Sequence, residues 1–98
     1  MTIEKNLNGT EMNIKVIGRL DTTTAPQLET EVKLNIVGVK KLVIDFAELE
    51  YLSSAGLRVL LSAHKIMSSK GGMKVTHVNE IVSEVFEVTG FADILTIE

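Results

Sequence analysis

The sequence predicts one α/β domain in which helices pack on a mixed β-sheet, and three observations predict it. The 98 residues are 45% hydrophobic, which suits a single domain with one core. Met12, Ile14 and Val16 alternate with polar residues, as in a half-buried strand. After that strand, stretches with helical spacing alternate with short apolar runs. We therefore expect one domain over residues 1–98, with the order β-β-α-β-α-β-α followed by an extended or helical end.

The N-terminal half predicts a hairpin followed by a helix. Residues 2–7 form a strand candidate, and Asn8-Gly9 is a pair favoured in tight hairpin turns. The second strand ends where the alternation stops, at residues 18–21. Thr24 is the candidate N-cap of the next helix, with Gln27 completing a capping box and Pro26 tolerated in the first turn. The buried face and the end of this helix are predicted at Leu28, Val32, Ile36 and Gly38.

The C-terminal half predicts two more strands, each followed by a helix. Residues 42–46 form a continuous apolar run that is typical of a strand covered on both faces, and residues 73–78 form the next strand. Ser53 or Ser54 can cap the helix between them, which ends at residues 70–72. Asn79 caps the last helix and Gly90 ends it, and residues 94–97 add a closing strand or a tail. The predicted buried positions of the two helices are Leu57, Leu60, Leu61, His64, Val82, Val85 and Phe86.

The composition excludes several classes of function. The net charge is −3 and the lysines and arginines are scattered, so no basic stripe is available for nucleic acid. There is no cysteine, and two isolated histidines do not make a zinc site, so we expect no metal. Gly71-Gly72 is a turn and not a phosphate loop, and we expect no cofactor. The N-terminus lacks the features of a signal peptide and no apolar run could span a bilayer, which predicts a cytoplasmic protein without a membrane partner.

Ser54 is the first candidate for a functional residue, because it lies where a buried strand leads through a short connection to the start of a helix. The N-terminus of a helix presents free N–H groups and a partial positive charge, which suit an anion such as a phosphate carried by Ser54. The alternative from position alone is that Ser53 and Ser54 only cap the helix.

A catalytic role for this serine is not indicated. Leu52 stands where a nucleophile elbow requires glycine, and His64 lies ten residues further along the same helix, ~15 Å away. His77 could approach Ser54 only if its strand ends nearby. Asp45, at the end of its strand, is either a polar ligand or a turn residue. We therefore predict a protein that is not an enzyme.

Three segments resemble the STAS-type anti-sigma factor antagonists of bacteria. The longest is the run Leu42-Val43-Ile44-Asp45-Phe46-Ala47-Glu48-Leu49-Glu50-Tyr51-Leu52-Ser53-Ser54-Ala55-Gly56-Leu57-Arg58-Val59-Leu60-Leu61. It is similar to the family's apolar strand, short loop with an aromatic residue, and serine motif at the start of a helix. Gly18-Arg19-Leu20-Asp21 and residues 88–95 also match family elements, so the resemblance covers nearly the whole chain. It implies a STAS domain with a switching function.

The resemblance implies a partner and a set of site residues. In this family an unphosphorylated antagonist binds an anti-sigma factor, often a serine kinase, and so indirectly releases a sigma factor; phosphorylation ends the contact. The phosphoacceptor falls on Ser54, with Ser53 as the alternative because Ser53 stands where the family usually has aspartate. The partner-binding positions are then Asp21, Thr22, Ser53, Ser54 and Gly56, where the glycine lets the two chains approach closely. The rival interpretations are a STAS scaffold subunit of a signalling complex, a subunit of a lipid transporter, or an enzyme accessory subunit.

Overall fold

The first two strands of the computed structural model, which describes residues 1–98, form an antiparallel hairpin. β1 (Thr2–Asn8) and β2 (Glu11–Leu20) pair from Thr2↔Ile17 to Asn8↔Glu11. Because Asn8 still pairs with Glu11, the turn residues are Gly9 and Thr10, one position later than the sequence predicts. Gly9 supplies the positive φ, at +66°, that a two-residue hairpin turn requires.

The remaining strands extend the hairpin into the predicted mixed sheet, in the order β1-β2-β3-β5-β6. β3 (Lys41–Asp45), β5 (Met73–Thr76) and β6 (Thr96–Ile97) run parallel to β2. Each parallel connection contains a helix, because parallel neighbours cannot be joined by a tight turn. These helices are α1 (Ala25–Asn35), α2 (Ser54–Ser68) and α3 (Glu80–Thr89), and a short 3₁₀ turn (Phe91–Asp93) precedes β6. The predicted α/β class is confirmed. The end of the chain, predicted to be extended or helical, contains both the 3₁₀ turn and the short strand β6.

One strand, β4 (Leu49–Leu52), was not predicted. It pairs in parallel with the last part of β2, through Gly18↔Leu49, Arg19↔Tyr51 and Leu20↔Leu52, with a register shift between Gly18 and Arg19. The alternation predicts only where β2 ends, and the residues just before Ser53 were expected to form a connection. The sequence does not indicate this strand because it is only four residues long. Its two outer leucines are buried while Glu50 and Tyr51 are exposed, which is not the period-two pattern of a strand.

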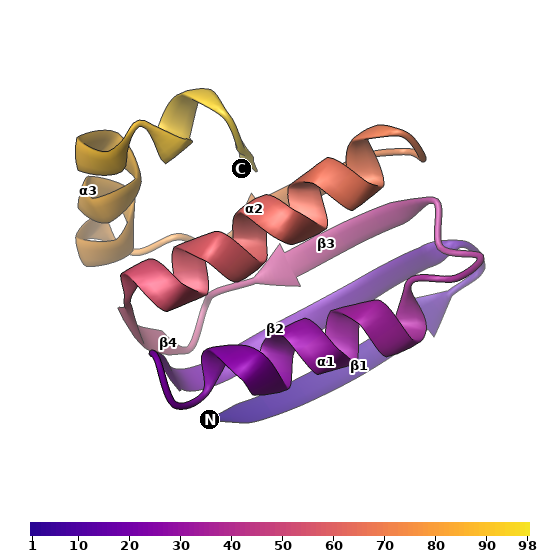
Figure 1. Ribbon diagram of the computed structural model, residues 1–98, viewed down its shortest axis with the longest axis horizontal. Coiled ribbons are helices and arrows are strands. Elements are labelled where there is room, and N and C mark those ends of the chain that lie inside the picture. Colours follow the sequence, from indigo (N-terminus) through magenta and orange to yellow (C-terminus); the bar gives the residue numbers. More distant parts are fainter.

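The helices cover one face of the sheet, and the core lies beneath them. Figure 1 shows α1 and α2 side by side in front of the sheet, with α3 beyond the end where β4 lies. Met12, Ile14 and Val16 of β2 point into the core, as predicted. Residues 42–44 are buried on both faces of the sheet, as predicted, although the helices cover only one of these faces. Leu42 and Ile44 belong to the core, whereas Val43 faces the open side and is covered by neighbouring polar side chains.

The helix faces follow the predicted spacing with one shift. In α1, Leu28 and Val32 are buried, and in α3 Val82 and Phe86 are buried while Val85 is half-buried. In α2 the buried face is turned from the predicted one, so Leu61 and His64 are only half-buried. The buried residues of α2 are Gly56, Leu57, Val59, Leu60, Ala63 and Met67.

The helix caps agree with the sequence at α3 and differ at α1. Asn79 Oδ1 accepts a hydrogen bond from Val82 N at 2.9 Å, and Gly90 ends α3 with a φ of +81°. The capping box expected from Thr24 and Gln27 does not form. Thr24 has a helical backbone and makes no side-chain cap, because its hydroxyl is used in the preceding turn, where it donates to Arg19 O at 2.7 Å.

Candidate functional site at the start of helix α2

Ser53 and Ser54 have different environments at the junction of β4 and α2. Ser53 is half-buried and extended, and its Oγ accepts a hydrogen bond from Gly56 N at 3.5 Å, so Ser53 is the N-cap. Ser54 is the first residue of α2 and is exposed, and its hydroxyl makes no hydrogen bond within the chain. The sequence allowed either serine to cap the helix; in the structure Ser53 has this role and the Ser54 hydroxyl is free.

The pairing of β4 with β2 brings Asp21 beside these serines. Leu20 pairs with Leu52, and Ser53 N donates to Leu20 O at 2.9 Å, so the residues that follow the two strands lie next to each other. Asp21 and Thr22 therefore meet Ser53 and Ser54 at one end of the sheet. The structure thus brings together four of the five residues that the resemblance implied.

Asp21 is held by a local network in the turn before α1. Its Oδ1 accepts hydrogen bonds from Thr24 N at 3.1 Å and Thr23 N at 3.0 Å. The Thr24 hydroxyl in turn accepts from Asp21 N at 2.9 Å. These bonds, led by the one from the Thr24 backbone, hold the pKa of Asp21 below its ordinary value, because they favour the ionised carboxylate. A permanent negative charge therefore lies in this turn at neutral pH.

Arg19 and Tyr51 also belong to this surface, and neither was identified from the sequence as a site residue. Arg19 stacks on Tyr51 across the β2–β4 pair, with its guanidinium carbon 4.2 Å from the ring centroid. Arg19 Nε also lies 3.7 Å from Asp21 Oδ2. Tyr51 is 40% exposed, so its ring remains available to a partner. The only sequence signal was the aromatic residue of the family motif; Arg19 could not be assigned without knowing the strand pairing.

A groove between α1 and α2 adjoins Ser54. Its volume is about 200 Å³, and Arg58, one helical turn after Ser54, forms part of its wall. Arg58 is exposed and makes no ion pair within the chain. The groove is lined by Thr22, Ala25, Pro26, Glu29, Ala55, Arg58 and Val59. We call six residues at this end the switch surface, of which Asp21 is half-buried and the others are exposed: Arg19, Asp21, Thr22, Tyr51, Ser54 and Arg58.

Gly56 is buried beneath the switch surface rather than exposed on it. A Cβ at this position would lie 2.7 Å from Leu52 Cδ1 and 2.8 Å from Leu20 Cγ. Both leucines are buried, so neither has free space to move into. The expectation that a side chain at Gly56 would hold a partner away is therefore wrong. The close approach that requires glycine is the packing of the first turn of α2 on β2 and β4.

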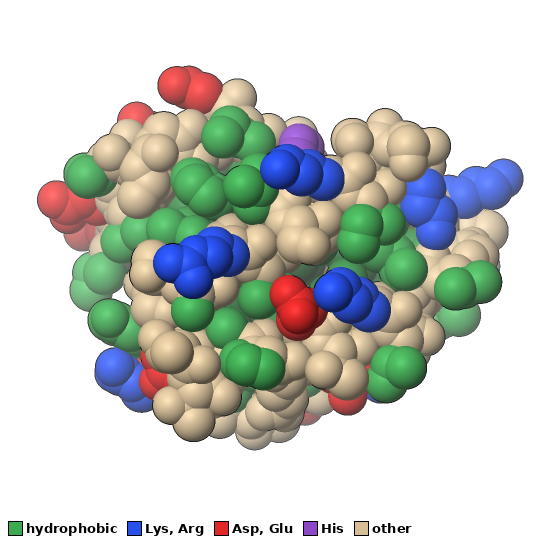
Figure 2. All heavy atoms as spheres, viewed as in Figure 1, with side chains coloured by type: hydrophobic (Ala, Val, Ile, Leu, Met, Phe, Trp, Pro, Cys, Tyr) green, Lys and Arg blue, Asp and Glu red, His purple; other side chains and the backbone are tan.

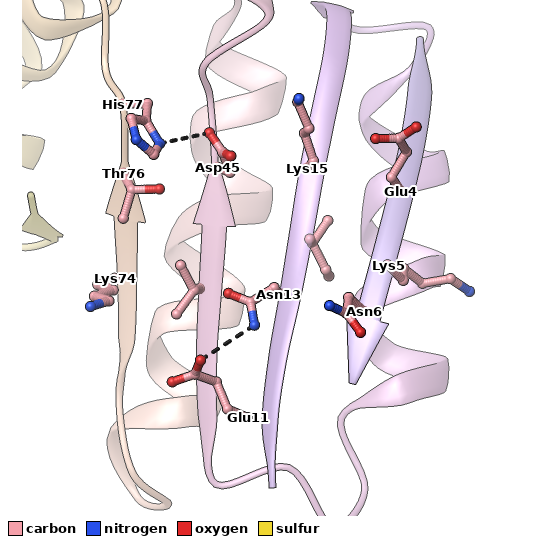
Figure 3. A pocket seen from close by; sticks show the side chains of 12 residues that line it. Glu4, Lys5, Asn6, Glu11, Asn13, Lys15, Asp45, Lys74, Thr76 and His77 are labelled. Atoms are coloured by element: carbon pink, nitrogen blue, oxygen red, sulfur yellow. Dashed lines mark hydrogen bonds and ion pairs between the residues drawn. The ribbon is translucent and has the colours of Figure 1, made fainter. Parts of the chain in front are cut away.

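The histidines and Asp45 make no hydrogen bond or ion pair with the two serines. His77 Nδ1 lies 3.0 Å from Asp45 Oδ1, which also accepts a hydrogen bond from Ala47 N at 2.8 Å, so Asp45 is a turn residue. Figure 3 shows this pair at the edge of a polar depression of about 390 Å³ on the open face of the sheet. His64 has a buried Nδ1 without a partner. Nowhere do three or more carboxylate or histidine side chains gather as metal ligands.

The helices are also too short or too polar to cross a membrane.

Comparison with known proteins identifies the family. The STAS domain model matches residues 2–98. BtrV of Bordetella bronchiseptica, named as a candidate anti-sigma factor antagonist, is 37% identical over 82 residues, which cover 82% of this chain and 71% of BtrV. The anti-sigma-B factor antagonist of Listeria monocytogenes is 32% identical, over 89% of this chain and 78% of that protein.

Solved structures show the same fold. An anti-sigma factor antagonist from Mycobacterium paratuberculosis superposes with a TM-score of 0.89 at 24% identity, covering 98% of this chain and 83% of that one. SpoIIAA in its unphosphorylated form superposes with a TM-score of 0.85 at 17% identity, covering 99% and 88%. The chain is thus a small α/β domain with the switch surface at one end of its sheet. It belongs to the STAS domain family, and its relatives include proteins named as anti-sigma factor antagonists.

Proposed function

We propose that this chain is an anti-sigma factor antagonist that acts in the bacterial cytoplasm without catalysis of its own. In its unphosphorylated form it binds an anti-sigma factor through the switch surface and thereby releases a sigma factor. The names of relatives that align with most of the chain support this proposal. The observation that carries it is the free, exposed hydroxyl of Ser54 at the start of α2, surrounded by the switch surface.

The switch is phosphorylation of Ser54 by the anti-sigma factor, acting as a serine kinase. A kinase must reach the hydroxyl and extend the side chain into its own active site. Ser54 meets that requirement because it is exposed and unbonded, whereas Ser53 is half-buried and occupied as the N-cap. Ser53 is the alternative acceptor, and its use would first require loss of the cap.

The composition of the switch surface supports a protein partner. Tyrosine and arginine are enriched among the residues that dominate binding energy at protein interfaces, and Tyr51, Arg19 and Arg58 are all exposed here. The rigid turn around Asp21 adds a fixed negative charge. A partner that fits this surface presents hydrogen-bond acceptors to the two arginines and a hydrogen-bond donor to Asp21, next to Ser54.

Phosphate transfer from ATP by the cognate anti-sigma factor tests the proposal. We expect one phosphate per chain, located on Ser54 by mass spectrometry, and none in Ser54→Ala. Ser53→Ala is the matched control, because it removes the neighbouring hydroxyl and should still accept phosphate. Phosphate on Ser53, or unchanged incorporation in Ser54→Ala, would contradict the assignment. Absence of binding to any anti-sigma factor would favour a scaffold or transporter subunit instead.

A further inference from the structure

Two exposed apolar patches lie at opposite ends of the long axis of the molecule. At one end, Leu34 in the last turn of α1 and Val37 just after it are 74% and 87% exposed. At the other end, Ile81 and Val88 of α3 are 67% and 81% exposed. No other large hydrophobic side chain of the protein is as exposed as these four. Figure 1 shows the loop after α1 at the right and α3 at the left.

The patch on α3 is surrounded by negative charge. Ile81, Val85 and Val88 follow the spacing i, i+4, i+7 and form one stripe along the helix. With Glu84 and Thr89 they line a shallow depression of about 290 Å³. The helix contains three exposed glutamates that make no ion pair, and it contains no lysine or arginine. We call this surface the acidic pole: Glu80, Ile81, Glu84, Val85, Glu87 and Val88.

The patch at the end of α1 is surrounded by positive charge. Lys70 Nζ donates a hydrogen bond to Ile36 O at 2.6 Å, which holds an ammonium group next to Val37. Lys40 is exposed and makes no ion pair, and Lys33 pairs only with Glu29, at 3.6 Å and exposed to solvent. In Figure 2, lysine and arginine side chains project from the right-hand end, and acidic side chains gather at the upper left. We call this surface the basic pole: Lys33, Leu34, Val37, Lys40 and Lys70.

We propose that the acidic pole of one copy docks on the basic pole of a second copy, so that the chain associates head to tail. Each pole exposes apolar area that gains by removal from water, and each has charges that make no ion pair in their own chain: the three glutamates at the acidic pole, and Lys40 and Lys70 at the basic pole. Contact between unlike poles places three unpaired carboxylates against ammonium groups. Contact between like poles would instead bring equal charges together, which excludes a two-fold dimer through either patch.

The two poles differ, so the contact is heterologous and leaves one free pole at each end of a pair. Further copies therefore add at both ends, and short chains form rather than a closed dimer. The patches are small, and we expect weak association, with a Kd of roughly 10–100 µM. This association uses surfaces that are separate from Ser54, so its test does not depend on the proposed switch.

Sedimentation velocity on the unmodified protein gives the first test. We expect the average mass to rise between about 10 µM and about 1 mM protein at low salt. It should fall back toward the monomer at about 0.5 M salt, because ions screen charges that are exposed to solvent. A monomer at every concentration would overturn the proposal and would mean that the poles serve another protein or none.

Two double variants then test which surfaces meet. Val37→Ser with Lys40→Ser weakens the basic pole, and Ile81→Ser with Val88→Ser removes the stripe of the acidic pole. All four side chains are exposed, so the fold should persist, as circular dichroism can verify. Each variant alone should associate at least tenfold more weakly than the unmodified protein.

An equimolar mixture of the two variants should restore association, but only to a pair, because each variant keeps one intact pole. Lys65→Ser is the matched control, since it removes an exposed cation that belongs to neither pole nor the switch surface, and it should associate like the unmodified protein. A mixture that stays monomeric, or a variant that still associates normally by itself, would overturn the head-to-tail arrangement.

Discussion

The backbone of Ser53 is extended, with φ −99° and ψ 174°, whereas the backbone of Ser54 is already helical. This difference turns the Ser53 hydroxyl back onto the free amide of Gly56, while the Ser54 hydroxyl points away from the chain's own donors and acceptors. At the scale of the residue, one serine thus stabilises the helix and its neighbour stays available for modification.

The two serines should therefore differ in their contribution to stability. Ser53→Ala removes the cap and should lower the free energy of unfolding by about 0.5–2 kcal/mol, at the lower end because the bond is long. Ser54→Ala removes no bond and should stay within about 0.5 kcal/mol. Urea unfolding of both variants checks this difference. Equal losses would show that both hydroxyls cap the helix.

Gly56→Ala should destabilise the domain without altering the chemistry of the switch surface. The added methyl group would collide with Leu20 and Leu52, and such overpacking costs about 1–3 kcal/mol. The better helix propensity of alanine offsets up to about 1 kcal/mol of this loss. Thermal unfolding measured beside calorimetric binding separates the effects. Normal stability with lost affinity would mean that Gly56 faces the partner after all.

At the scale of the element, β4 positions the site although it is only four residues long. Its pairing with β2 places Leu52 beside Leu20 and Tyr51 beside Arg19, so the residues on either side of the two leucines contribute to the switch surface. The turn from β2 into α1 is shaped by Asp21, whose carboxylate binds two backbone amides in place of the capping box that the sequence predicts. The geometry of the site thus depends on a strand end and a turn, not on a cavity.

The ionised carboxylate of Asp21 should stabilise the fold in a defined pH range. Its pKa in the folded chain lies below the unfolded value of about 3.9, so the stabilisation is fully present above that value. It is lost as the pH falls through the folded pKa. Asp21→Asn should therefore be less stable than the unmodified protein at pH 7, and the difference should shrink below about pH 4.

Urea unfolding of both proteins at a series of pH values measures this difference. Asp93→Asn is the control, because Asp93 is exposed and accepts no hydrogen bond. A difference between Asp21→Asn and the unmodified protein that does not change with pH would show that charge is not the cause.

At the scale of the whole molecule, the helices cover one face of the sheet and leave the other open and polar. The switch surface lies at one end of the covered layer, where β2, β4, α1 and α2 meet. A phosphate at Ser54 would lie at the positive end of α2 and one turn from Arg58, so the fold can accept it. The switch we propose is thus a local change of charge on a rigid domain.

Phosphorylation of Ser54 should weaken binding to the anti-sigma factor by two orders of magnitude or more. The partner must desolvate this surface, and burying an unpaired dianion costs several kcal/mol, where each 1.4 kcal/mol is tenfold in affinity. Ser54→Asp should reproduce part of the loss, since it adds one charge instead of nearly two. Calorimetry and circular dichroism on the three forms should show lost affinity with an unchanged fold. Equal affinity for all three would reduce Ser54 to a structural residue.

Local sequence patterns were enough to predict the α/β class, most of the elements and the serine pair as the candidate site. These follow from local signals: the alternation of Met12, Ile14 and Val16, the cap at Asn79, and the glycine at the end of α3. Such signals lie within a few residues, because side-chain period and cap chemistry are properties of one element. The family resemblance, which is also a property of the sequence, added Asp21 and Thr22 to the serines.

The residues that surround Ser54 could be identified only from the folded chain. The pairing of Arg19 with Tyr51 joins residues 32 positions apart, and no local pattern encodes the register between two such segments. The inward direction of Gly56 and the polar side chains that cover Val43 also depend on which elements pack against them. Local chemistry specifies elements, whereas the choice of neighbours is settled only when the whole core is buried at once, and the switch surface is made of such neighbours.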